Sequence, residues 1–315
     1  MHSLEPEIRA LHAQGVLDDE AASRLAAVER GEVFAVGGEI RLLLYGGVLL
    51  VTGGVGTLLA RNLDRLGPVA IVAGIAFAAL ASAAPALRAR RAGRMPGPGA
   101  DYLLLLGVLL AAADLGYAEV QFGMLGPAWS WHFLIVTAAS AAVAYAFDSK
   151  PVLAASLASL AAWFGVGASY ADPLQPWPDG VEFGGRALSC GTLVAIWKVA
   201  DIRLRPRTGF GAVFDHCAAT LAFWGALAWC LQPGWTWAGL PILGALAALS
   251  IRHGLLAARE SFIVYGIGYA ALGLCFALLP RVDGGRTASA IALAVVGVAA
   301  WAIWTLRRRM KERGA

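Results

Sequence analysis

The sequence predicts an all-α integral membrane protein: a polytopic helical bundle of about 10 transmembrane helices, preceded by a short soluble helical pair. Hydrophobic residues make up 59% of the chain and charged residues 15%, whereas a soluble domain carries about 25% charged residues. The charges between Ile40 and Leu306 fall almost entirely between apolar runs. Those runs are continuous, as in 103–113 and 288–300, which excludes the alternating polarity of a transmembrane β-barrel.

Residues 1–36 are predicted to form a cytosolic pair of short helices. Leu4, Ile8 and Leu11 share one helical face, and Gly15 ends that segment. An acidic pair then begins a second short helix, where it favours the positive helix end. Helices of this size bury little surface alone, so they should pack on each other, on the membrane or on a protein partner. The segment lacks a signal-peptide core, so the first span is expected to direct insertion.

A transmembrane domain is predicted over 37–315. A hydrocarbon layer about 30 Å thick needs roughly 20 helical residues, and ten apolar segments approach or exceed that length. The segment 184–200 is the weakest, because Arg186 and Lys198 bracket it closely; if it did not cross, the C-terminus would change sides. The expected spans lie near 40–60, 67–87, 102–120, 132–148, 151–170, 184–200, 212–231, 235–251, 261–279 and 287–306.

The basic residues between these segments predict the orientation. With ten spans and both termini in the cytoplasm, 20 of the 25 Lys and Arg residues lie on the inner side and 5 on the outer side. Trp residues are frequent in the outer loops, as in an interfacial belt. This bias also accounts for the net charge of +4. The lipid bilayer is therefore the expected partner, and no nucleic acid is expected.

Polar residues of the third span mark the candidate binding site. Asp114 lies at membrane depth, where an ionised side chain costs about 2.5–3.5 kcal/mol. Tyr117 and Gln121 share its helical face, and Arg186 enters the sixth span at comparable depth. Three interpretations stay open. Asp114 and Arg186 form a buried ion pair that holds two helices in register, or Asp114 binds a proton, a cation or a ligand. If the span ends early, Asp114 is instead exposed to water.

Further polar and aromatic residues fall in the same outer region, and Glu119, Trp131 and His132 complete the candidate site. If the outer residues converge, they form a pocket with acidic and aromatic walls, suited to a cation, a sugar or a headgroup. If they do not, they form an ordinary interfacial collar. The other outer residues are Trp129, Tyr170, Asp172, Trp177, Asp179 and Glu182.

The inner ends of the spans carry charges that are expected to be structural. Lys198 and Asp201 lie three residues apart and are predicted to pair. Asp215, followed by His216, begins the seventh span, where a carboxylate favours the helix N-terminus. Two further pairs, Arg252-His253 and Arg259-Glu260, are interpreted as an electrostatic collar.

Motifs of known catalytic chemistry are missing from the sequence. It has no GxxxxGK[ST], HExxH or GxSxG motif, and no His/Cys metal cluster. The 4 cysteines lie inside apolar runs without a CxxC pair, so they are interpreted as packing residues. No cofactor or metal is expected, and enzymatic activity is left uncertain and disfavoured.

The N-terminal third resembles a family of bacterial multi-pass membrane proteins, the domain of unknown function 2157. The resemblance rests on a pattern L-x-x-x-G-x-L/I-(S/D)-x-E-x-A, present as Leu11-HAQGVLDDEA-Ala22, and on a first span containing Leu44-Tyr45-Gly46-Gly47. It implies a polytopic fold and no established activity. The Ala-, Gly- and Arg-rich composition indicates a GC-rich bacterial genome and hence a cytoplasmic (inner) membrane.

Three functional hypotheses follow. The favoured one is small-solute binding or transport through a polar site near the outer half of the bundle, centred on Asp114 and Arg186. The second is a membrane scaffold that docks a protein partner through the N-terminal helical pair. The third is a membrane enzyme that acts on lipid or cell-wall precursors at the outer face through Glu119, His132 or Asp172.

Overall fold

The structure is a computed structural model. The chain folds into two compact units, residues 1–58 with residue 315, and residues 59–314. The described residues are 12–14, 18–19, 22–23, 37–62, 67–93, 97–128, 130–166, 179–205, 209–257, 259–279, 282 and 284–313.

The first unit contains most of helix α3 (Gly37–Asn62), which continues past Leu58. Most of the predicted helical pair over 1–36 lies outside the described residues. Within the described part, a side-chain oxygen of Asp19 lies 2.7 Å from Nε2 of His12.

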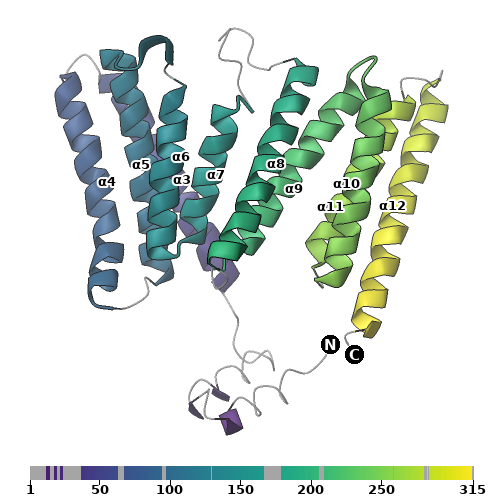
Figure 1. The fold of residues 1–315 in the computed structure, drawn as a ribbon, viewed down its shortest axis with the longest axis horizontal. Helices are drawn as coiled ribbons and strands as arrows, with labels where there is room; N and C mark the ends of the chain where they lie inside the picture. Colours follow the sequence, from purple (N-terminus) through teal and green to yellow (C-terminus); the bar gives the residue numbers. More distant parts are fainter. Residues whose placement is uncertain are drawn as a thin grey trace. The chain divides into compact units, whose positions relative to one another are not determined.

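The second unit contains nine helices in its described residues, and Figure 1 shows α4 to α12 following one another in chain order. All ten expected segments, the first of them in α3, coincide with a helix, and the described residues contain no strand. The nine helices are α4 (Pro68–Arg91), α5 (Pro98–Phe122), α6 (Trp131–Phe147), α7 (Lys150–Trp163), α8 (Gly180–Leu204), α9 (Gly211–Leu231), α10 (Thr236–Leu256), α11 (Glu260–Leu278) and α12 (Gly285–Arg313).

Six helices in the described part of the chain are long and apolar enough to cross a membrane: α4, α5, α9, α10, α11 and α12. In α3 the run whose side chains are described, Leu42–Gly54, is apolar, and α6 has only 17 residues. The 14 residues of α7 cover about 21 Å at 1.5 Å per residue, less than a bilayer core. Helix α8 is long enough, but five charged residues interrupt it. The all-helical class is therefore confirmed, and a total of about ten crossings stays a prediction.

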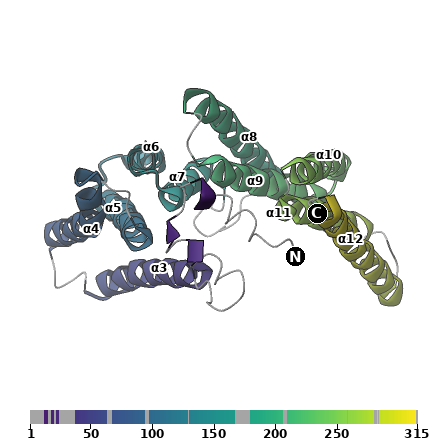
Figure 2. The same ribbon diagram turned by 90° about the horizontal axis from the view of Figure 1, so that it is seen from below.

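Successive helices pack in pairs, α4 on α5, α6 on α7, α8 on α9 and α10 on α11. Helix α9 also contacts α7, α10 and α11, and it lies between them in the end-on view of Figure 2. Small residues bring some pairs close together. A Cβ atom added at Gly107 of α5 would lie 2.7 Å from the carbonyl oxygen of Ala79 in α4. The α10–α11 contact is equally tight, because a Cβ at Gly266 would lie 2.8 Å from the carbonyl oxygen of Ala247.

Hydroxyl groups hold the short helix α7 against α6. Ser156 donates to the carbonyl oxygen of Thr137, and Ser159 donates to that of Phe133, each at 2.8 Å. Both bonds join different helices, so they fix the register of this pair.

Candidate functional site

Helix α5 carries two buried polar atoms without a hydrogen-bond partner. They are Oδ1 of Asp114 and the hydroxyl oxygen of Tyr117. The two residues are three apart, so their side chains lie on one helical face. Leaving a buried polar atom unsatisfied costs about 1–3 kcal/mol, and most such atoms in proteins have a protein or water partner. We therefore take Asp114 and Tyr117 as the candidate site. Gln121 is exposed one turn further on.

The expected ion pair between Asp114 and Arg186 is not formed in the described structure. The Arg186 guanidinium pairs with Glu182, one turn earlier on the same helix. A partner four residues away on one helix needs no long-range packing. Helix α5 packs on α4, α6 and α7, whereas α8 packs chiefly on α9.

Glu119 has a structural role in the turn after α5. Its buried carboxylate accepts hydrogen bonds from the backbone N–H of Leu125, at 2.9 and 3.1 Å, and of Gly126, at 3.0 Å. Helix α5 ends at Phe122, and the φ of 58° at the next residue, Gly123, is left-handed, a conformation that favours glycine. The carboxylate therefore satisfies the backbone of the turn that leads into α6.

The aromatic candidates lie at the start of α6. Trp131 is half exposed and contacts the edge of Trp163, with ring centroids 6.4 Å apart. His132 is buried, and its ring centroid lies 3.9 Å from that of Phe133. Neither of these two ring contacts involves Asp114 or Tyr117. The outer-loop residues that lie outside the described part are Trp129, Tyr170, Asp172 and Trp177.

A second polar cluster was not predicted from the sequence as a single site, and we call it the Asp215 cluster: Lys198, Asp215, His253 and Arg259. Lys198 of α8 donates to Oδ1 of Asp215 in α9. On the other carboxylate oxygen, Oδ2, Nη1 of Arg259 lies at 3.3 Å and Nε2 of His253 at 3.6 Å. The Asp215 side chain is only 15% exposed. One carboxylate thus joins α8, α9, α10 and the residue preceding α11.

The partner of Lys198 differs from the prediction, because Lys198 pairs with Asp215 instead of Asp201. Asp201 is buried and hydrogen-bonds to Tyr145. Nε1 of Trp197 donates to the Tyr145 hydroxyl at 3.1 Å, and the Arg205 guanidinium lies 4.8 Å from the centre of the Tyr145 ring. The order of the helices is the signal that could have predicted the Lys198–Asp215 pair. Neighbouring helices are antiparallel, so the end of α8 and the start of α9 lie on the same side.

Aromatic rings pack around the Asp215 cluster. The ring of His216 stacks on Phe262, with centroids 4.9 Å apart and an interplanar angle of 19°. His253 meets the same Phe262 ring edge-on, at 5.0 Å and 88°. Among the described residues, no group of three or more His, Cys, Asp or Glu is placed to hold a metal ion.

Residues 9–153 match the family model of the domain of unknown function 2157, described as a predicted membrane protein. The match covers a little under half of the chain, and it confirms the resemblance found in the N-terminal third. It includes Asp114 and Tyr117 and ends before the Asp215 cluster. Searches of curated proteins and of solved structures gave no match. The chain is thus a membrane protein of unknown function.

Proposed function

We propose that this membrane protein binds, and in its full activity transports, a small cationic solute through Asp114 and Tyr117 of α5. The observation that supports the proposal is the pair of buried acceptor atoms without partners on one helical face. A carboxylate and a phenol oxygen together suit a monovalent cation or a small amine, because both provide lone pairs and one provides negative charge. A bound cation would supply the missing partner and offset the burial of the carboxylate.

The proposal includes the membrane arrangement predicted from the sequence. Ten helices cross a bacterial inner membrane, and residues 1–36 and the C-terminus lie in the cytoplasm. The six long apolar helices and the one-sided distribution of basic residues support this arrangement. In it, Asp114 lies in the outer half of the bundle. Such placement is typical of ionisable residues on ion or solute pathways.

Thermal unfolding of the purified full-length chain tests the binding step. The melting temperature is measured by Trp fluorescence in chloride salts of sodium, potassium, ammonium and ethanolamine at one ionic strength. A ligand that binds only the folded state stabilises it by about 2.7 kcal/mol at a hundred times its dissociation constant. We expect at least one of these cations to raise the melting temperature of the wild type and to lose this effect in Asp114→Asn.

A matched variant separates the site from general charge effects. Asp179→Asn removes an exposed carboxylate just before α8, and it should respond to the cations as the wild type does. Tyr117→Phe keeps the ring and removes the unpaired hydroxyl, so it should weaken the response. If wild type and Asp114→Asn respond identically to all four cations, the proposed site is wrong.

Flux measurements separate binding from transport. Proteoliposomes loaded with the responding cation should exchange it in the wild type and not in Asp114→Asn. Deletion of residues 1–36 should leave the thermal response intact, whereas it would abolish the activity of a scaffold that docks its partner there. Glu119 is a weaker candidate for a catalytic residue under the enzyme hypothesis, because its carboxylate accepts hydrogen bonds from the backbone of the turn after α5.

A further inference from the structure

Helix α4 packs on α5 with one face and exposes the opposite face. Ile75, Ala79 and Ala86 are buried, and Ala79 lies on the α5 side, against Gly107. On the opposite side, Phe77 is 74% exposed and Leu80 is 69% exposed. In an apolar helix that is long enough to cross a membrane, such a face is expected to contact lipid.

Two arginines continue the exposed face at the last turn of α4. Arg88 and Arg91 follow Phe77 by about three and four helical turns, so they lie on the same side of the helix. Both side chains are exposed. Arg90 lies on another side, where its guanidinium is 5.1 Å from the centre of the Phe147 ring. The exposed face of α4 therefore changes from hydrocarbon to guanidinium at its end.

The charges of Arg88 and Arg91 are not neutralised by any carboxylate in the described part of the chain. No ion pair there involves either guanidinium, and α4 itself contains no acidic residue. The last carbonyl groups of a helix carry about half a negative charge, which two guanidinium groups exceed. This end of the helix thus offers a net positive charge to an anion.

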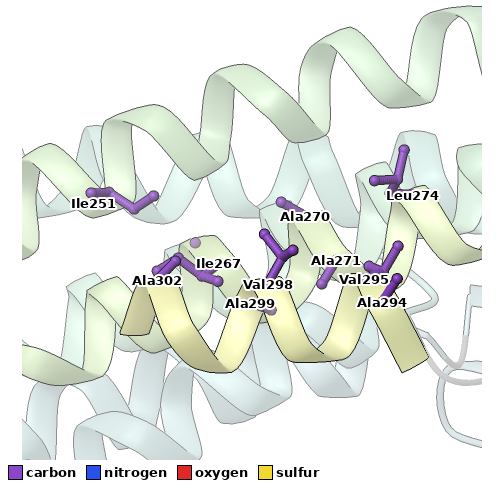
Figure 3. A pocket seen from close by; sticks show the side chains of 11 residues that line it. Ile251, Ile267, Ala270, Ala271, Leu274, Ala294, Val295, Val298, Ala299 and Ala302 are labelled. Carbon is purple, nitrogen blue, oxygen red and sulfur yellow. The ribbon is translucent and has the colours of Figure 1, made fainter. Parts of the chain in front are cut away.

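The end of α12 gives a contrast, because its arginine is already paired. Nε of Arg307 donates to Oε2 of Glu260 at 2.7 Å. The neighbouring groove between α11 and α12 has a volume of about 410 Å³, and every side chain labelled in Figure 3 is hydrocarbon. Since the charge of Arg307 is already balanced, it does not select an occupant, and we assign no ligand to that groove.

The length and chemistry of the exposed α4 face match a lipid. From Phe77 to Arg88 the helix rises about 16 Å at 1.5 Å per residue, close to the depth of one leaflet, about 15 Å. Arginine binds phosphate oxygens through paired N–H donors. Basic residues next to a span attract anionic lipids, which are enriched on the cytoplasmic side, the side on which the proposed arrangement places this end of α4.

We propose that the exposed face of α4 binds an anionic glycerophospholipid of the surrounding bilayer. Its acyl chains lie along Phe77 and Leu80, and its phosphate contacts Arg88 and Arg91. A second copy of the chain fits less well, because a two-fold contact between parallel α4 helices would bring the arginines of both copies together. The inference rests on the proposed crossing of the membrane by α4, and it does not involve Asp114.

Native mass spectrometry of the purified, delipidated full-length chain tests the proposal. The chain is incubated with an equimolar mixture of phosphatidylglycerol and phosphatidylcholine of the same acyl length, and the bound lipids are counted. The wild type should retain phosphatidylglycerol preferentially. Arg88→Gln/Arg91→Gln should lower that preference about tenfold or more, since each arginine near an anionic headgroup contributes about fivefold. Arg88→Lys/Arg91→Lys keeps both charges and should retain most of the preference.

A matched variant separates this face from the total charge of the protein. Arg203→Gln/Arg252→Gln also removes two exposed arginines, but from two different helices, α8 and α10, and it should keep the preference. Asp114→Asn should keep it as well, so the result does not depend on the cation site. Excess glycerol 3-phosphate should not displace the lipid, because the acyl chains contribute to binding.

Four results would overturn the proposal. The first is equal preference in the wild type and in Arg88→Gln/Arg91→Gln. The second is an equal loss in Arg203→Gln/Arg252→Gln, which would assign the effect to total charge. The third is full displacement by glycerol 3-phosphate, which would indicate a site for a free phosphate. The fourth is a wild-type dimer that Leu80→Trp abolishes, which would assign this face to a second copy of the chain.

Discussion

Asp114 in α5 and Asp215 in α9 are both carboxylates within apolar helices, yet they have opposite surroundings. Asp215 lies against Lys198, Arg259 and His253 from neighbouring segments. Oδ1 of Asp114 is buried and has no hydrogen-bond partner. A satisfied carboxylate is explained by the helices that it joins. An unsatisfied carboxylate lowers the stability of the fold, and no contact between helices explains it. We therefore assign the ligand to α5.

The comparison predicts a large loss of stability when the Asp215 carboxylate is removed. Asp215→Ala leaves three basic groups facing one another without their shared partner. Breaking a fully buried ion pair costs 3–5 kcal/mol. The partners here are 23%, 41% and 43% exposed, so we expect about 2–4 kcal/mol. Equilibrium unfolding in mixed micelles measures the free energy. Lys198→Met/Asp215→Ala should lose less than the two single changes combined, and strict additivity would contradict the coupling.

Removal of the Glu119 carboxylate should lower stability by a smaller amount. The test decides whether Glu119 is a structural carboxylate, like Asp215, or a candidate site residue, like Asp114. Glu119→Ala removes the acceptor for the backbone N–H groups of Leu125 and Gly126 and should destabilise by about 1–3 kcal/mol. Hydrogen exchange should increase locally at residues 124–126. As a control, Glu182→Gln breaks a more exposed pair with Arg186 and should change stability by about 0–1 kcal/mol. If the exchange of the turn is unchanged in Glu119→Ala, Glu119 becomes available again as a site residue.

The smallest expected effect concerns the register of α6 and α7. Ser156→Ala removes one hydrogen bond between helices, which is worth about 0.6 kcal/mol on average in membrane proteins. Ser82→Ala is the matched control, because that hydroxyl donates only to the carbonyl oxygen of Ala78 in its own helix. Ser156→Ala should lower the unfolding midpoint more than Ser82→Ala does. A larger loss from Ser82→Ala would show that bonds between helices are not what distinguishes α7.

The helices could be predicted from the sequence because hydropathy is a local property. Each apolar run coincides with a helix, including the weak segment 184–200. The largest difference in length concerns the expected span 151–170, where α7 ends at Trp163 and Gly165 follows with a left-handed φ of 72°. A glycine in an apolar run also occurs inside helices, so the sequence pattern does not separate the two cases.

Contacts between distant residues could not be predicted in the same way. Asp114 lies in an apolar run of the sequence, but the ion pair with Arg186, one of the interpretations left open, is not formed, because Arg186 meets Glu182 on its own helix. The link from Lys198 to Asp215 depends on how α8 packs on α9. The bonds of Glu119 depend on the path of the turn after Gly123. The last two features follow from tertiary structure, whereas the Glu182–Arg186 pair follows from a four-residue spacing on α8.

The most direct test of the central claim is the unfolding free energy of Asp114→Asn beside that of Asp215→Asn, in the absence of added cations. Both changes remove one charge and keep the shape of the side chain. We predict that Asp215→Asn destabilises the protein, because it weakens the ionic contacts with Lys198 and Arg259, and that Asp114→Asn leaves stability unchanged or raises it. A loss in Asp114→Asn as large as that in Asp215→Asn would show that Asp114 is a structural residue, and it would contradict the account.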